Sequence, residues 1–293
     1  MKSTTEKNTL KNIRYKNAEL AYIKSNKTLR LVCKEYQIDR HSFSNYLKSK
    51  NISTRKKINS CDTMFEIIDT EEKAYWLGFL YADGCVSYNK VSFPTRYVVE
   101  LSLKESDKVH IEKFQKFMNS TRNIEYRKNT KSFRIQIFSK KLCEDLIKLG
   151  CTNKKSLTLK FPTLEQVPLN FINSFIRGYV DGDGSIVLNN KTNCLNKLMI
   201  LGTKEFLDDL IKIKQLTCSL KKDKRHLGNT FNIVPNIQES MSLLNSIYSN
   251  GTVYLERKYN LYLLAVQHRN ELNYERAKTV KGEIPNTVLS TLI

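Results

Sequence analysis

The sequence reads IRGYVDGDGSI at residues 176–186 and WLGFLYADG one hundred residues earlier, at residues 76–84. Both segments are apolar, both carry a small residue four positions after a glycine, and both contain Asp-Gly. Positions i and i+4 share one face of a helix, so each segment predicts a groove almost free of side chains. Two such helices can pack backbone to backbone along these grooves. The small residues expected at the contact are Gly78, Ala82, Gly178 and Gly182.

Each of these helices is expected to end at an aspartate, because the glycine that follows is typical of a residue just beyond a helix C-terminus. The packing then brings Asp83 and Asp183 side by side at the same end of the helix pair. A helix C-terminus carries a partial negative charge. Two carboxylates beside two such ends therefore predict a cation site.

The two segments belong to a longer repeat. After each Asp-Gly we expect two strands, an amphipathic helix, a second hairpin and a further helix that closes at Gly150 or Gly251. Asp83 lies 67 residues before Gly150, and Asp183 lies 68 residues before Gly251. This nearly equal spacing predicts an α+β fold of two pseudo-symmetric αββαββ halves.

The two segments resemble the LAGLIDADG motif of homing endonucleases, in the form that carries two motifs on one chain. The second copy matches closely. The first has Trp76 and Leu77 where the motif has Leu-Ala, and Tyr81 where it has its first Asp, a position that is usually structural in the family. The resemblance covers about 200 residues, from Glu71 to Leu272. It implies a saddle-shaped DNA-binding surface and a site-specific endonuclease of a mobile genetic element, which hydrolyses phosphodiester bonds on both strands of a duplex.

The resemblance also implies the roles of the motif residues. Asp83 and Asp183 become the metal ligands, helped by the backbone carbonyls of Ala82 and Gly182. The expected ion is Mg²⁺, with Mn²⁺ as a substitute, because carboxylate oxygens suit an ion that keeps several waters. A divalent metal activates water and stabilises the leaving oxygen of a phosphodiester.

A basic residue near each scissile phosphate is expected in this family. The segments after the two closing glycines have the right position, and we predict Lys155 and Lys258 in this role. The alternative for either lysine, in a chain this basic, is a solvated surface charge. The two sheets are expected to lie in the major groove, where Arg pairs with guanine and Asn or Gln with adenine. Base reading is assigned to Arg134, Gln136 and Asn232, which alternate with apolar residues.

Residues 28–48 predict two short helices joined at Gln37-Ile38-Asp39, with Thr28 as the cap of the first. This pattern resembles a helix-turn-helix, although Gln37 stands where a glycine is common; the alternative is an ordinary helical hairpin. The outer face of the second helix carries residues that can contact phosphates and base edges. These are Arg40, His41, Ser42, Ser44, Asn45 and Lys48.

Four regions follow from these patterns. Residues 1–59 form a basic arm, loosely ordered over 1–17, with the helix-turn-helix and a linker. Residues 60–165 and 166–272 form the two halves, and residues 273–293 a polar C-terminal tail.

Composition narrows the partner and the compartment. The 293 residues include 49 Lys+Arg against 29 Asp+Glu, a net charge of +20, which favours a polyanion partner, with nucleic acid as the first candidate. The resemblance implies that this partner is double-stranded DNA with a long pseudo-palindromic or asymmetric target. No apolar run approaches the ~18 residues of a membrane span, and the N-terminus lacks the hydrophobic region of a secretion signal. Seven cysteines without a Cys-x-x-Cys pair support neither disulfides nor zinc. We expect a monomeric intracellular protein of the cytoplasm or nucleoid, without a membrane partner.

Two other functions remain open on the same scaffold. A DNA-binding transcriptional regulator with this fold also carries a helix-turn-helix, but typically loses the motif acids, which both stand here. An intron maturase that binds RNA would show the same charge and fold.

Overall fold

The computed structural model describes residues 4–24, 29–52, 54, 62–89, 96–153, 155, 158–223 and 230–281. The chain divides into two compact units, residues 1–58 and residues 59–293. Each unit is described by itself.

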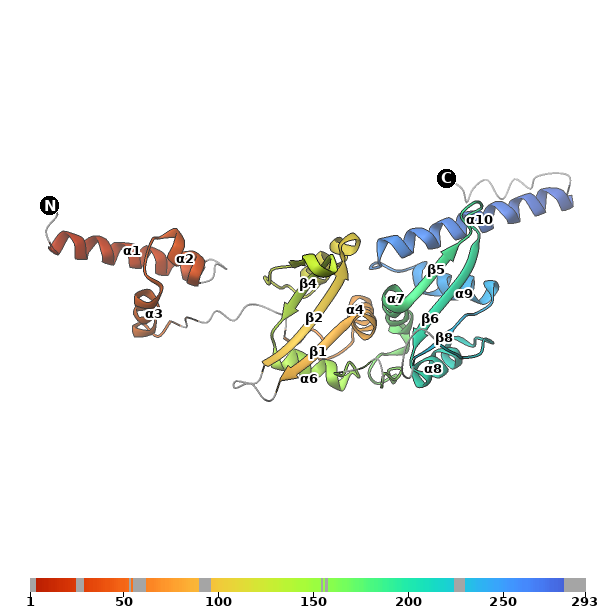
Figure 1. The fold of residues 1–293 in the computed structure, drawn as a ribbon, viewed down its shortest axis with the longest axis horizontal. Coiled ribbons are helices and arrows are strands. Elements are labelled where there is room, and N and C mark those ends of the chain that lie inside the picture. Colours follow the sequence, from red (N-terminus) through yellow and green to blue (C-terminus); the bar gives the residue numbers. More distant parts are fainter. Residues whose placement is uncertain are drawn as a thin grey trace. The chain divides into compact units, whose positions relative to one another are not determined.

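The N-terminal unit consists of α1 (Thr4–Lys24), α2 (Leu29–Glu35) and α3 (Arg40–Ser49). The expectation of a loosely ordered arm over 1–17 is wrong for residues 4–17, which form the first part of α1. The helix is stabilised by packing, because Tyr15, Ala18 and Tyr22 recur on one face and are buried against α2 and α3. Figure 1 shows these three helices at the red end of the chain.

The turn between α2 and α3 lies at the residues that the sequence indicated. Asp39 caps α3, since its carboxylate accepts a hydrogen bond from the backbone N–H of Ser42 at 2.8 Å. Gln37 has a φ of 51°, in the left-handed region that favours glycine. Phe43 and Leu47 are fully buried against the other two helices. Thr28, the expected cap of α2, lies outside the described residues.

The second unit contains two halves with the same order of elements, as predicted. The first half runs through α4 (Glu71–Ala82), β1 (Gly84–Asn89), β2 (Arg96–Lys104), α5 (Lys108–Phe117), β3 (Glu125–Arg127), β4 (Ser132–Ile137) and α6 (Lys140–Lys148). The second runs through α7 (Ile172–Asp183), β5 (Gly184–Leu188), β6 (Leu195–Gly202), α8 (Lys204–Lys214), β7 (Lys221–Lys222), β8 (Phe231–Ile233) and α9 (Ile237–Tyr248).

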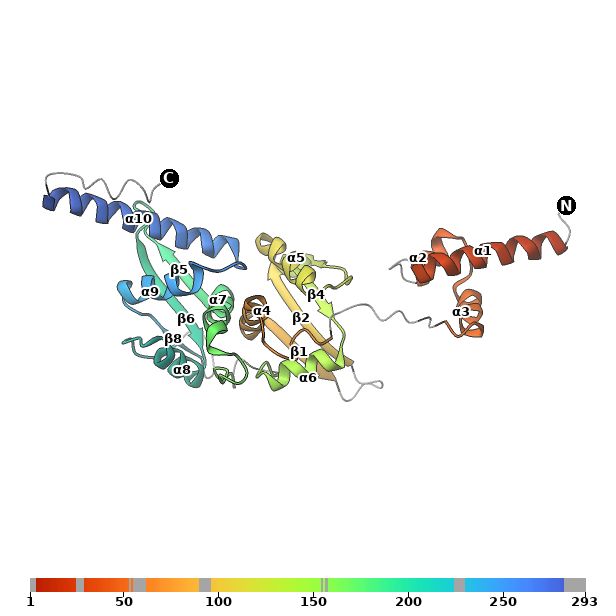
Figure 2. The same ribbon diagram turned by 180° about the vertical axis from the view of Figure 1, so that it is seen from behind.

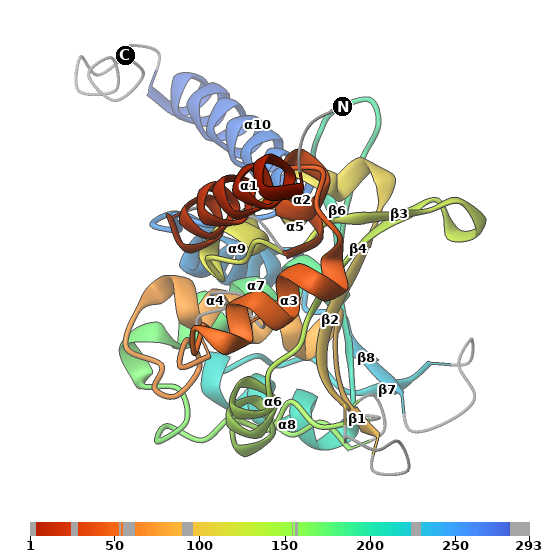
Figure 3. The same cartoon turned by 90° about the vertical axis from the view of Figure 1, so that its left-hand side faces the viewer.

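Each half builds one antiparallel sheet with the same topology. The strand orders are β1-β2-β4-β3 and β5-β6-β8-β7. Helices cover one face of each sheet and leave the other face open (Figure 3). On β4, Ile135 and Ile137 are buried toward the helices, while Arg134 and Gln136 lie on the open face. The alternation read from the sequence therefore holds along this strand.

The motif helices α4 and α7 lie side by side between the two sheets (Figures 1 and 2). Their backbones touch at the predicted small residues. A Cβ atom on Gly78 would lie 2.0 Å from the carbonyl oxygen of Phe175, and one on Gly178 would lie 1.9 Å from that of Tyr75. One on Gly182 would lie 2.2 Å from Cβ of Ala82. Any larger side chain would push the helices apart.

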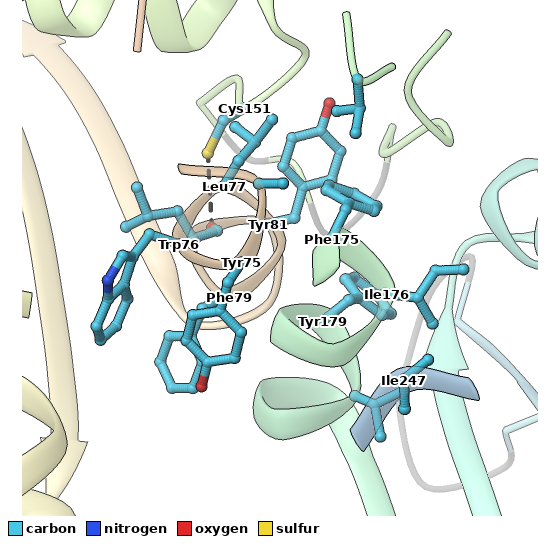
Figure 4. Packing of buried hydrophobic residues seen from close by; sticks show 14 of the residues in the cluster. Tyr75, Trp76, Leu77, Phe79, Tyr81, Cys151, Phe175, Ile176, Tyr179 and Ile247 are labelled. Atoms are coloured by element: carbon cyan, nitrogen blue, oxygen red, sulfur yellow. Dashed lines mark hydrogen bonds between the residues drawn. The ribbon is translucent and has the colours of Figure 1, made fainter. Parts of the chain in front are cut away.

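The larger side chains of both helices pack around this seam. In Figure 4, Trp76 points from α4 toward its own sheet, and Tyr81 lies near Phe175 of α7. The rings of Tyr81 and Phe175 meet edge to face with centroids 5.0 Å apart. Both halves thus bury their apolar residues in one continuous core around the helix pair.

Two expectations about chain ends need correction. Gly184 follows α7 with a φ of −86°, not in the left-handed region, because the chain passes directly from the helix into β5. The polar tail expected from residue 273 is helical through Lys281, as the end of α10 (Glu256–Lys281). This helix packs against α9 and β5.

Candidate functional site

The two motif acids stand at the paired ends of α4 and α7. Asp83 is the C-cap of α4, and Asp183 is the last residue of α7. The close approach of Ala82 and Gly182 sets their separation, and a Cβ on Gly182 would lie 3.3 Å from Oδ2 of Asp83. The acids are therefore neighbours because the helices meet at residues without bulk.

This placement makes the carboxylates costly to ionise. Burial raises the pKa of Asp183 to about 6, and the negative charge of Asp83 adds to the shift. Burial also raises the pKa of Asp83, against the cations Lys258, Lys155 and Arg257. Three nearby cations thus oppose the rise at Asp83, whereas the charge of Asp83 adds to the rise at Asp183. A cation beside the pair would relieve the repulsion.

Lys155 lies beside both motif ends. Its Nζ donates a hydrogen bond to the carbonyl oxygen of Ala82 at 2.8 Å. It also lines, with Asp183, Tyr179 and Thr203 among others, a cavity of about 200 Å³. The lysine belongs to the segment after α6, and it reaches across to the acid of the other half.

Lys258 repeats this contact in the second half. Its Nζ donates to the carbonyl oxygens of Val180 at 2.7 Å, Gly182 at 3.2 Å and Gly184 at 2.5 Å. The residue is 3 % exposed, and burial lowers its pKa to about 8. Each predicted lysine therefore contacts the carbonyl that precedes a motif acid, a contact that the sequence did not reveal.

The donor set at this place fits a small divalent cation. Among the described residues, no three His, Cys, Asp or Glu side chains come together as a metal cluster. An ion here would draw on Asp83, Asp183, the carbonyls of Ala82 and Gly182, and water. This oxygen-only set with few protein ligands suits Mg²⁺ or Mn²⁺ better than zinc.

Asp181, which the sequence analysis left without a role in this chain, lies at the centre of a buried hydrogen-bond network. It is fully buried and accepts from the hydroxyls of Tyr75 at 2.8 Å and Tyr248 at 2.5 Å, and from the N–H of Leu255 at 2.8 Å. Burial raises its pKa, and the three donors oppose that rise. Leu255 stands three residues before Lys258, so Asp181 also fixes the approach of that lysine.

The residues predicted to read bases lie on the open sheet faces, but they differ in surroundings. Arg134 contacts Glu100 at 3.5 Å and Glu125 at 2.5 Å, and Gln136 donates to Glu100 at 2.6 Å. Asn232 pairs in register with Leu201 and Lys221. The cross-strand partner Glu100 was missed, because its contact depends on the register of β2 and β4.

In the N-terminal unit, the predicted contact residues occupy the outside of α3. Arg40, His41, Ser42, Asn45 and Lys48 are exposed, and Ser44 is half-buried. The unit thus offers a polar helix face beside its own core. None of the helices in the described part of the chain is long and apolar enough to cross a membrane.

Comparison with known proteins gives distant similarities of chain path. No family model and no curated protein sequence matches the chain. Among solved structures, the meganuclease I-SmaMI bound to uncleavable DNA is 14 % identical over 68 % of this chain and 95 % of its own, with a TM-score of 0.46.

Two further solved structures are similar at the same level. The LAGLIDADG homing endonuclease I-LtrWI bound to target DNA is 11 % identical over 74 % of this chain and 99 % of its own, with a TM-score of 0.46. A variant of I-DmoI in complex with target DNA and Mn is 17 % identical over 65 % and 98 %, with a TM-score of 0.45. Of these three, I-LtrWI bears the name of the family that the two motif segments of this chain resemble.

Proposed function

We propose that this protein is a LAGLIDADG homing endonuclease that cuts both strands of a specific DNA duplex as a single chain. The observation that carries the proposal is the repeated acid and lysine arrangement at the ends of α4 and α7. Asp83 and Asp183 stand side by side, and Lys155 and Lys258 each contact the carbonyl before one of them. A scaffold kept only for binding has no need of two such arrangements.

The side chains divide the chemistry between them. Asp83 and Asp183 would hold a divalent cation, which would activate a water and stabilise the leaving oxygen. Lys258, with a pKa lowered to about 8, can give or take a proton at Nζ near neutral pH. Lys155, bound to the carbonyl of Ala82 and beside the cavity at Asp183, holds a positive charge where a phosphate would approach.

The open sheet faces supply the contact with DNA in this proposal. Lys221 pairs with Asn232 on the second sheet, Lys197 lies further along β6, and the whole chain carries a net charge of +20. Such a surface attracts the phosphate backbone at long range. On the first sheet, Glu100 orients Arg134 and Gln136, and we propose that this pre-set pair reads base edges.

The N-terminal unit adds a second DNA contact as a helix-turn-helix, with the exposed face of α3 toward the duplex. Deleting residues 1–59 is expected to weaken binding and flatten its salt dependence, because fewer phosphates are neutralised. The remaining core should still cut at high protein concentration. An unchanged affinity and salt slope would show that the unit is a structural hairpin.

One experiment tests the function directly. The protein is incubated with Mg²⁺ and a library of duplexes, and the new ends are sequenced; a single cleaved site on both strands is expected. Parallel samples contain Mn²⁺, EDTA or the matching RNA. Binding to a defined duplex without cutting in either metal would establish a regulator. Selective binding of structured RNA would establish a maturase.

A further inference from the structure

The two segments that carry the lysines are each held by the opposite half. Lys155 begins a turn in which the N–H groups of Thr158 and Leu159 donate to its carbonyl at 3.0 and 2.8 Å. The carbonyl of Leu159 in turn accepts a hydrogen bond from the hydroxyl of Thr203. Thr203 belongs to the second half and is 1 % exposed. A residue of the second half therefore fixes the first half's lysine turn.

The second lysine is held in the same way by the first half. Arg257, directly before Lys258, places Nε 3.1 and 3.0 Å from the two carboxylate oxygens of Asp107. Asp107 is 6 % exposed and stands at the N-cap of α5, yet it makes no capping hydrogen bond to that helix. Lys113 of α5 supports the same segment through the carbonyl of Tyr254 at 3.4 Å. The carboxylate of Asp107 is thus directed at the partner half instead of its own helix.

The two contacts occupy equivalent places. Thr203 is the N-cap of α8, as Asp107 is of α5, and both helices follow the second strand of their half. One contact is a neutral hydrogen bond and the other an ion pair, so the chemistry differs while the position is shared. The two contacts are therefore made from the same position in each half.

We propose that Asp107 and Thr203 are positioning residues, each setting the lysine of the opposite half at its motif carbonyl, so that neither half completes its site alone. This inference rests on the proposed endonuclease function. Lys155 depends on a single described hydrogen bond at Nζ, to Ala82, and its turn is anchored through Leu159. A displacement of a reacting group by about 1 Å can slow a reaction by about 100-fold.

The test measures each strand separately. Asp107→Asn removes the ion pair, and Thr203→Val removes the hydroxyl at nearly constant volume. The substrate is a supercoiled plasmid that contains the target. Asp107→Asn should slow the cleavage of one strand by 10- to 100-fold, and this should be the same strand whose cleavage is lost in Lys258→Met. Thr203→Val should slow the strand that Lys155→Met loses. Nicked circles, opposite in strand for the two variants, are the expected product.

Matched controls separate positioning from general damage. Glu112→Gln removes a solvent-exposed acid of α5 that pairs with Lys108, and Thr203→Ser keeps the hydroxyl; both should cut like the wild type. Arg257→Gln breaks the same ion pair from its more exposed partner and replaces Asp107→Asn if that variant does not fold. Equal slowing of the cleavage of both strands by Asp107→Asn and by Thr203→Val would overturn the proposal.

A second measurement tests the positioning roles without depending on cleavage. Acylation of surface amines, followed by mass spectrometry without DNA, should show Lys258 protected in the wild type. Asp107→Asn should raise the reactivity of Lys258 several-fold and leave Lys155 unchanged, and Thr203→Val should do the reverse. Unchanged reactivities would overturn the positioning roles. Wild-type protein that cuts neither strand would defeat the endonuclease proposal alone, while the acylation result would still decide the positioning.

Discussion

The two halves share the path of their motif helices but not the polar groups inside them. At the positions of Leu77 and Tyr81 in α4, the second half has Arg177 and Asp181 in α7. Arg177 is 2 % exposed, and it donates to the carbonyls of Val253 at 2.8 Å and Ile247 at 2.6 Å and pairs with Glu71 of the first half. Of the two motif helices, only α7 therefore carries buried charged side chains, Arg177 and Asp181.

The first half solves the same packing problem with neutral groups. The hydroxyl of Tyr81 donates to the carbonyl of Leu149, beside Gly150, whose φ is 95°. Gly251, at the equivalent place, leaves room for the guanidinium of Arg177, since a Cβ there would lie 2.7 Å from it. Each closing glycine thus makes space for a different side chain. The two halves share the contacts between backbones, whereas their side-chain chemistry differs.

The largest effect is expected where the halves are alike. Gly78→Ala and Gly178→Ala each place a Cβ within about 2 Å of the facing backbone, which cannot move aside without separating the helices. Both variants should lose more than about 4 kcal/mol of the free energy of unfolding, the range of exceptional single substitutions. Urea denaturation measures it, with Gly202→Ala, whose new Cβ would meet side chains only, as the milder control. A tolerated Gly78→Ala would contradict the equivalence of the two halves at this seam.

The motif acids should also behave alike in activity. Asp83→Asn or Asp183→Asn keeps the size of the side chain but removes a charge needed for the cation, a loss of several kcal/mol, or about 1000-fold in rate. Gel shifts should show binding that is intact or tighter, because a negative charge near the phosphates is gone. Strand-resolved cleavage in Mg²⁺ should show nicking or no product. If either variant cut both strands at the wild-type rate, these acids would have no role beyond ending their helices.

Substitutions at equivalent buried positions of the two motif helices should lower the free energy of unfolding by different amounts. Asp181→Leu leaves the hydroxyl of Tyr248 and the N–H of Leu255 buried without their acceptor, and leaves the Tyr75 hydroxyl with His110 as its partner at 3.0 Å, which should cost about 3–5 kcal/mol. Tyr81→Phe removes a single neutral hydrogen bond and should cost about 1 kcal/mol. Chemical denaturation of both variants tests the difference. Equal losses would mean that the network around Asp181 is not the stronger connection.

The pH dependence of stability should separate the two acids by a smaller margin. The folded pKa of Asp183, about 6, lies above the ordinary 3.8, so its contribution to stability is present below pH 3.8 and is lost as the pH rises through 6. Without metal, Asp183→Asn should therefore be more stable than the wild type at pH 7–8 by about 2 kcal/mol, allowing for partial exposure. The gain should vanish near pH 4, and Asp83→Asn should gain less. A constant difference across this range would assign the effect to causes other than titration.

Local sequence patterns predicted much of the fold and the two acids of the site. The small residues Gly78, Gly178 and Gly182 and the nearly equal spacing to the closing glycines predicted the helix pair, and thereby the neighbouring aspartates. Alternation placed Arg134 and Gln136 on the open face of β4. These features are readable because helix and strand periods relate residues close in sequence.

Tertiary structure decided whatever depends on residues distant in sequence. The network of Asp181, the ion pair of Arg257 with Asp107, and the bond from Thr203 to Leu159 each join separate elements, so no local period announces them. The same holds for Glu100 beside Arg134, which requires the register of two strands, and for α1, whose helix is stabilised by burial of Tyr15 and Tyr22. The sequence by itself determined that two helices meet and bring two acids together. Which side chains contact the two lysine segments depends on the packing between the halves. The free energy of a buried polar contact depends on its partner in space, not on its neighbours along the chain.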